Sequence, residues 1–175
     1  MASILKVDQI KNTSSSGDID IPTGYKIKGV DTGSIVAPGQ IIQVKSVSGS
    51  TSAEISSGTY TDVPGSSVSI TPTSTSSKIL IIGSIAAETR GSGTDRGIRL
   101  RMVRGSTALQ TSTYNLYMSS NNNQRISMVT MHYLDSPATT SATTYKFQFN
   151  TTGSSATARV NQYASSNVTV MEVAQ

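Results

Sequence analysis

The sequence predicts an all-β protein in which an N-terminal extended arm, residues 1–39, precedes an antiparallel jelly-roll-type β-sandwich, residues 40–175. Three observations support this fold class. Apolar and polar residues alternate with a period of two along most of the chain, which is the pattern of half-buried strands. Clusters of Gly, Pro, Ser and Asn divide these runs into short segments. No stretch carries the apolar repeat of an amphipathic helix.

Turn residues set the limits of the expected strands in the sandwich. The expected strands, in order, are 40–48, 53–56, 66–71, 77–88, 97–104, 107–111, 113–118, 125–134, 143–150, 156–162 and 167–174. The alternation assigns the following residues to common faces: Ile98, Leu100 and Met102; Tyr145, Phe147 and Phe149; Ile126, Met128, Thr130, His132 and Leu134; Val168, Val170 and Glu172, with Thr169, Met171 and Val173 opposite. Several short antiparallel strands at this spacing are typical of a sandwich or jelly roll.

One strand is apolar on both faces. Residues 78–85 read KILIIGSI, so neither face is polar enough to prefer water. Such a strand is either central with both faces covered, or one face meets a partner subunit. We expect residues 79–85 and 168–173 to be buried between sheets or between subunits.

The arm differs from the rest of the chain because it contains too few apolar residues to form a core. Those that need another surface are Ile4, Leu5, Val7, Ile10, Ile19 and Ile21. Residues 36–39 (VAPG) form a natural boundary before the main domain. An arm that cannot bury its own apolar face favours assembly with other chains.

The composition excludes several classes of protein. Charged residues are 14% of the chain, against about 25% in typical domains, and Ser and Thr together are roughly three residues in ten. The absence of Cys excludes a disulfide framework, a thiolate metal site and a thiol nucleophile. No run of about 18 apolar residues is present to insert into a membrane. Residues 1–12 lack the apolar core of a secretory signal, so the mature chain is expected to start near Met1.

Five short motifs in a fixed order resemble those of one group of proteins. The chain opens with SILKVDQI (residues 3–10), and a Ser/Gly loop then leads to DIDIP (residues 18–22). Residues 69–80 carry an ITP…SSKIL pattern, and residues 133–140 carry a YLDSP pattern followed by Tyr145. With VMEV at residues 170–173 as the last strand, the chain resembles tail-fibre-like virion proteins of bacteriophages, especially phages of aquatic bacteria.

The resemblance implies a homotrimer of jelly-roll domains, similar in shape to the tumour-necrosis-factor and complement globular-head fold, on the outside of a virion. It implies a non-enzymatic structural protein, made in the host cytoplasm, whose arm (residues 1–39) docks to other virion proteins or intertwines with its copies. The long repetitive shaft of a long tail fibre is missing, which favours a short fibre or appendage. A capsid decoration or cement protein, a head fibre and a lectin-like glycan-binding module are the alternatives.

A polar loop near aromatic residues is the candidate receptor-facing site. Its members are Tyr117, Asn121, Asn122, Asn123 and Arg125. Amide groups and aromatic rings suit a host cell-surface glycan, because sugars present hydroxyl groups to amides and C–H faces to rings. The alternative is an ordinary hydrophilic loop tip.

Other candidate sites lack the partners that their chemistry requires. His132 is the single histidine and is expected to face inward, so it could bind a metal only where three copies meet on a symmetry axis. Asp18 and Asp20 alternate beside Gly17, but no closing Glu follows to complete a Ca²⁺ loop. The remaining acidic residues are scattered, so no glycosidase-type carboxylate pair can be identified. We therefore expect no catalytic residue, no metal and no cofactor.

The densest basic stretch contains Arg90, Arg96, Arg99, Arg101 and Arg104. Arginines that alternate with apolar residues indicate a solvated sheet face, and no aromatic residues interleave with them to stack on bases. We therefore expect no nucleic-acid partner. Two roles remain open for these arginines: attraction to an anionic cell surface or an acidic capsid neighbour, or ion pairs between subunits with Glu88, Asp95 or Asp135.

Overall fold

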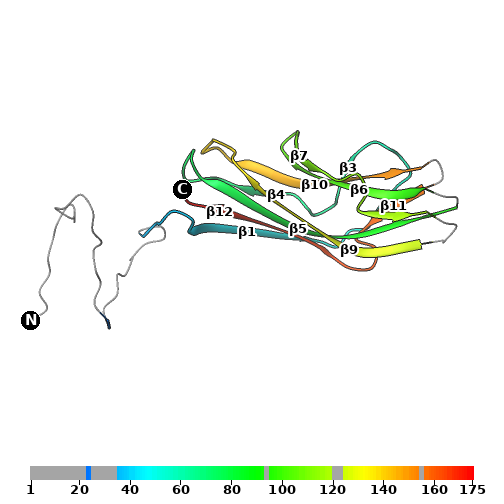
Figure 1. Ribbon diagram of the computed structural model, residues 1–175, viewed down its shortest axis with the longest axis horizontal. Coiled ribbons are helices and arrows are strands. Elements are labelled where there is room, and N and C mark those ends of the chain that lie inside the picture. The colour runs from blue at the N-terminus through cyan, green and yellow to red at the C-terminus, as the bar shows by residue number, and fades with distance from the viewer. Residues whose placement is uncertain (1–22, 25–34, 93–94, 120–123, 154–155) are drawn as a thin grey trace, which may run out of the picture. The chain divides into compact units, whose positions relative to one another are not determined.

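The computed structural model describes residues 23–24, 35–92, 95–119, 124–153 and 156–175 (Figure 1). The chain divides into two compact units, Met1–Ile35 and Val36–Gln175. Across the described ranges every regular element is a strand. No helix with the length and apolar character needed to cross a membrane is found in this part of the chain.

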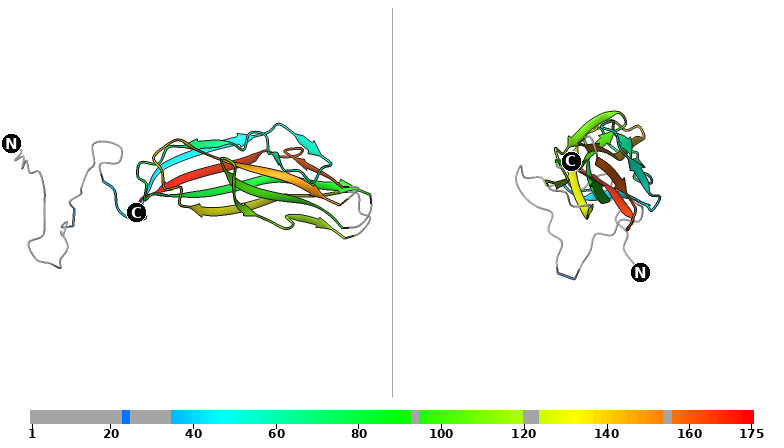
Figure 2. Two further views of the ribbon diagram at one scale, coloured as in Figure 1. Left: turned by 90° about the horizontal axis from the view of Figure 1, so that it is seen from above. Right: turned by 90° about the vertical axis from the view of Figure 1, so that its right-hand side faces the viewer.

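The second unit is a sandwich of two antiparallel sheets, seen as two layers in Figures 1 and 2. Sheet A contains β1 (Ile41–Gly49), β12 (Ser166–Val173), β5 (Lys78–Gly91), β9 (Gln124–Asp135), β11 (Ala156–Val160) and β2 (Ala53–Ile55). Sheet B contains β3 (Thr61–Asp62), β4 (Val68–Ile70), β10 (Thr143–Thr152), β6 (Arg96–Arg104), β7 (Thr107–Thr111) and β8 (Leu116–Met118).

The strand order is that of a jelly roll. Sheet A runs β1-β12-β5-β9, and sheet B runs β4-β10-β6-β7. When these strands are followed along the chain, the path crosses between the sheets in two nested Greek keys, which is the jelly-roll connection. The predicted all-β jelly-roll-type sandwich is therefore confirmed. The structure adds the short strand β3, whose two exposed residues gave no apolar alternation to detect.

Strand β5 is the longest strand and organises sheet A. It pairs along its whole length with β9 on one side, and on the other side it pairs first with β12 and then with β11. Its inward residues Ile79, Ile81 and Ile85 are fully buried in the core between the sheets. A Cβ atom at Gly83 would overlap the ring of Phe147 from β10, so this glycine lets the two sheets approach each other. The predicted apolar faces of β6, β10 and β12 lie in the same core.

Two buried carboxylates stabilise the sandwich through hydrogen bonds. Asp135, at the end of β9, accepts two hydrogen bonds from Arg104 Nη1 at 2.9 and 2.7 Å and one from Tyr145 Oη at 2.7 Å. Burial, together with the hydrogen bond to Asp135, raises the pKa of Tyr145. Asp135 therefore forms its ion pair with Arg104 within one chain, not between subunits as expected, and this pair ties sheet B to sheet A.

The second buried carboxylate, Glu172, lies on the inward face of β12. Its Oε1 accepts hydrogen bonds from the Thr73 amide and hydroxyl, both at 2.7 Å, and its Oε2 accepts one from Gln43 Nε2 at 3.2 Å. Burial by itself raises the pKa of Glu172, but the hydrogen bonds from Thr73 and Ser77 outweigh it and hold the pKa below its ordinary value. Glu172 thus fixes the turn that precedes β5.

Candidate functional site

The outer face of sheet A carries a contiguous set of apolar side chains. Strand register places Val44, Met171, Leu80 and Leu134 in one row across β1, β12, β5 and β9. We define the apolar face as Ile41, Val44, Leu80, Ile82, Ala86, Ile126, Met128, Leu134, Met171 and Val173. Six of these are exposed: Val44 (55%), Leu134 (50%), Ile41 (49%), Ile126 (49%), Met128 (45%) and Ile82 (37%).

Charged residues lie only at the ends of this face. On β5 the outward residues between Lys78 and Glu88 are Leu80, Ile82, Ser84 and Ala86, none of which is charged. Single exposed apolar residues are normal on protein surfaces, but a contiguous exposed set marks a surface that meets another molecule. The structure therefore explains why residues 78–85 are apolar on both faces of strand β5. One face packs in the core, and the other face belongs to the exposed apolar face of sheet A.

His132 lies within the apolar face, and the prediction that it faces inward is wrong. Its side chain is exposed beside Ile82, its register partner on β5. The alternation placed His132 with Thr130 and Leu134 correctly, but the sequence does not reveal which side of β9 faces the core. No group of three or more His, Asp or Glu residues that could hold a metal ion is present among the described residues.

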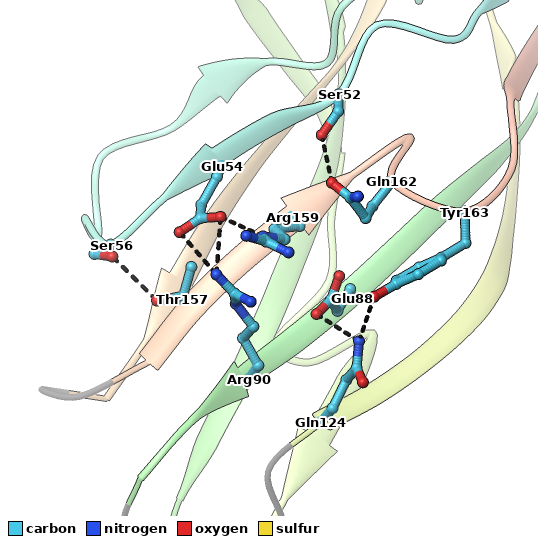
Figure 3. A network of polar contacts seen from close by, with 10 residues as sticks. All are labelled: Ser52, Glu54, Ser56, Glu88, Arg90, Gln124, Thr157, Arg159, Gln162 and Tyr163. Carbon is cyan, nitrogen blue, oxygen red and sulfur yellow. Dashed lines mark hydrogen bonds and ion pairs between the residues drawn. The ribbon is translucent and has the colours of Figure 1, made fainter.

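Beyond Glu88 the outer face of sheet A becomes polar (Figure 3). Glu54 on β2 forms ion pairs with Arg90 on β5, at 3.2 Å, and with Arg159 on β11. The hydrogen bond from Arg159, with the charge of Arg90 beside it, holds the pKa of Glu54 below its ordinary value. Two further cross-strand contacts, Ser52 to Gln162 and Ser56 to Thr157, continue this polar surface.

A small pocket lies where the apolar and polar parts of this outer face meet. Its volume is about 100 Å³, and its walls include Ala86, Glu88, Ile126, Met128 and Tyr163. Gln124 Nε2 donates to Glu88 Oε1 at 2.8 Å and to Tyr163 Oη at 2.9 Å (Figure 3). The pocket thus has an acidic residue among mainly apolar walls.

The outer face of sheet B is polar and basic. The guanidinium carbon of Arg101 lies 4.0 Å from the centre of the Tyr60 ring, and that of Arg99 lies 5.4 Å from the centre of the Tyr114 ring. Tyr60 and Arg99 also line a hollow of about 300 Å³ together with residues 111–113. Sequence reasoning missed these pairs because the tyrosines come from other segments than the arginines. The sequence did indicate, through the alternation of residues 98–102, that both arginines lie on one face.

An ion pair continues the same face of sheet B. Lys146 Nζ lies 2.7 Å from Asp62 Oδ2, and Gln148 Nε2 donates to Asp62 Oδ1 at 2.6 Å. Burial by itself raises the pKa of Asp62, but the hydrogen bonds from Lys146 and Gln148 outweigh it, so the pKa lies below its ordinary value. Arg96, in contrast, is buried, so the five arginines do not form one solvated face.

The predicted receptor-facing loop is described in part. Arg125 Nη1 donates to the Tyr117 carbonyl at 2.9 Å, so the structure brings these two residues together. The Tyr117 hydroxyl donates to Asp95 Oδ1, and this hydrogen bond raises the pKa of Tyr117. The amide residues 121–123 lie outside the described residues. So do Asp18, Asp20 and the predicted docking residues Ile4, Leu5, Val7, Ile10, Ile19 and Ile21.

No family model and no curated protein matches the chain. Solved structures that are similar to 86% of it come from infectious bursal disease virus. Three of them are the VP2 subviral particle (13% identity, TM-score 0.42), the Gx strain (15%, 0.41) and the virus-derived T=1 particles (11%, 0.40). The similar region covers 41 to 43% of those chains, so this chain spans less than half of their length.

Proposed function

We propose that this protein is a non-enzymatic structural protein of a bacteriophage virion, a short fibre or appendage on the particle surface that assembles as a homotrimer. One observation carries the proposal. The apolar face extends across four neighbouring strands of sheet A and is exposed in a single chain. The phage-like motifs of the sequence supply the virion context.

The homotrimer places the apolar face of each subunit against its neighbours and leaves the outer face of sheet B toward solvent. Fully burying a Val, Leu, Ile or Met side chain stabilises by about 1.5–3 kcal/mol, so each half-exposed member contributes on the order of 1 kcal/mol when covered. A closed ring also protects sheet edges from pairing with other chains. The arm, residues 1–39, docks to other virion proteins or intertwines with its copies.

The oligomeric state tests the trimer directly. Light scattering on the full chain is expected to return about 55 kDa, three times the 18.4 kDa of one subunit. A mass near 18.4 kDa at micromolar concentrations would overturn it.

The location on the particle separates the fibre from its main alternative, a capsid decoration, cement or head-fibre protein. Electron micrographs of particles labelled with a specific antibody are expected to show label on tails. Label on heads would favour the alternative, and its absence from the particle would refute both.

A specific observation favours host-surface binding as a second function. The outer face of sheet B combines two arginines, two tyrosine rings and a hollow lined by hydroxyl groups, which suits an anionic glycan on a cell surface. A glycan array probed with purified protein is expected to show binding to acidic glycans. No binding would leave the chain with a purely structural role.

A further inference from the structure

Three carboxylates of the described chain are almost completely buried: Glu88, Asp135 and Glu172. Asp135 and Glu172 each accept at least three hydrogen bonds, and both oxygens of each have a donor. Glu88 differs. Its Oε1 accepts one hydrogen bond, from Gln124, and its Oε2 has no hydrogen-bond partner among the described residues.

A buried carboxylate oxygen without a donor is costly. Burying a polar group without a hydrogen bond costs several kcal/mol if nothing compensates, and most buried polar atoms in proteins have a partner. Glu88 is 1% exposed and lines the pocket that opens on the outer face of sheet A. The pocket therefore leaves space beside the Glu88 side chain for a donor from another molecule.

The pocket walls indicate the class of that donor. Ala86, Ile126 and Met128 are apolar, and Tyr163 also lines the pocket. Figure 3 shows Tyr163 beside Glu88 and Gln124. A divalent cation such as Ca²⁺ needs six or more oxygen ligands, which one carboxylate does not provide. A primary ammonium on an alkyl chain matches the pocket. Its N–H groups donate to Glu88, its methylenes contact the apolar walls, and its charge is attracted to the Tyr163 ring.

We propose that the Glu88 pocket binds a primary alkylammonium group. Two sources share this chemistry: a lysine side chain of a neighbouring chain, and a free alkylamine. The lysine source rests on the proposed assembly, because Ile126 and Met128 belong both to the pocket and to the apolar face. Binding of a free amine does not depend on that assembly, so the proposals for the pocket and for the trimer can be disproved separately.

The first arm of the test uses n-butylammonium on the full chain, with n-butanol as the uncharged control. The methyl signal of Met128, in protein labelled with ¹³C at methionine methyl groups, is expected to shift saturably with butylammonium and not with butanol. Glu88→Gln keeps the size of the side chain and removes its charge, so it should weaken binding at least tenfold. Glu54→Gln, on the same sheet face outside the pocket, is the matched control and should bind as the unmodified protein does.

The second arm identifies a lysine that already fills the pocket in the assembly. In that case the Met128 signal does not respond to butylammonium. Glu88→Gln then raises, at least tenfold, the protein concentration below which light scattering shows dissociation, whereas Glu54→Gln leaves that concentration unchanged. Equal responses to butylammonium and butanol would overturn the proposal. So would no response together with unchanged assembly of Glu88→Gln. The comparison of butylammonium with butanol uses the unmodified protein, so it remains decisive even if the Glu88→Gln variant folds poorly.

Discussion

The two outer faces of the sandwich differ in the molecule they are suited to meet. The outer face of sheet A exposes large apolar side chains from β1, β5 and β9 and has no charge on β5 between Lys78 and Glu88. The outer face of sheet B presents Arg99, Arg101 and the Lys146–Asp62 ion pair. Both faces belong to one sandwich with one core, so packing of that core does not require the difference between them. Sheet A is suited to protein contact and sheet B to water or a charged surface.

The largest expected effect comes from placing charge on the apolar face. Val44 and Leu134 lie at opposite ends of one row of that face, so V44K/L134K puts two ammonium groups into the proposed interface. Burying unpaired charges costs several kcal/mol, so we expect association to weaken at least a thousandfold, about 4 kcal/mol.

Light scattering over a range of concentrations measures this effect. T144K adds a lysine at an exposed position of β10 in sheet B and serves as the matched control, with the trimer mass retained. If both variants lost the trimer, or if both kept it, the proposed distinction between the two outer faces would be contradicted.

Adjacent residues on β5 separate the folding of one chain from the assembly of several. Ile81 is fully buried in the core, whereas Ile82 is 37% exposed on the apolar face. Ile81→Ala is expected to lower the free energy of unfolding by about 3 kcal/mol at every protein concentration. Ile82→Ala should cost less than about 1 kcal/mol in the dissociated chain and weaken association instead.

Denaturant unfolding at low and high protein concentration distinguishes the two variants. If Ile82→Ala were as destabilising as Ile81→Ala in dilute solution, the outer side of β5 would be part of the single-chain core.

Local patterns were sufficient to predict the sandwich. The period-two alternation placed Tyr145, Phe147 and Phe149 together, and all three are buried in the core. The expected strands 97–104 and 107–111 left residues 105–106 as a turn, and these residues form the β6–β7 connection, where Gly105 has a φ of 57°. These features depend on neighbours within a few residues, which a single sequence displays.

The candidate sites could not be predicted in the same way, because they depend on which strands lie side by side. Tyr60 and Arg101 are 41 positions apart, yet they stack on one face. His132 was assigned to the correct set of residues but to the wrong side of β9, since Thr130 and Leu134 fit either side. The partners of Glu88 come from β9 and from the segment after β11, and no local motif joins them.

Acid should weaken the single chain more through Glu172 than through the outer face of sheet B. The folded-state pKa of Glu172 is lowered, so its contribution is present above the unfolded pKa, about 4.3, and is lost as the pH falls through the folded value. Glu172→Gln is expected to cost about 2 kcal/mol at pH 7, because its donors lose a charged acceptor.

Unfolding measured between pH 7 and pH 3 should show a smaller acid-induced loss of stability for Glu172→Gln than for the unmodified protein. Asp62→Asn is the comparison on sheet B, where the carboxylate is half exposed and the ion pair contributes little. An unchanged pH dependence in Glu172→Gln would show that other carboxylates control acid unfolding.

The smallest expected effect tests whether the outer face of sheet B is left uncovered. Arg101 stacks on Tyr60, and in the proposed trimer no neighbouring subunit covers it. Arg101→Ala should therefore lower the free energy of unfolding by less than about 1 kcal/mol. The trimer mass should not change, and Arg101→Lys should lie between the two proteins in stability because it keeps the charge but loses the planar stack. Light scattering that showed dissociation of Arg101→Ala would place sheet B inside the interface. The contrast between the faces would then reflect two kinds of protein contact, apolar on one side and charged on the other, instead of an inside and an outside.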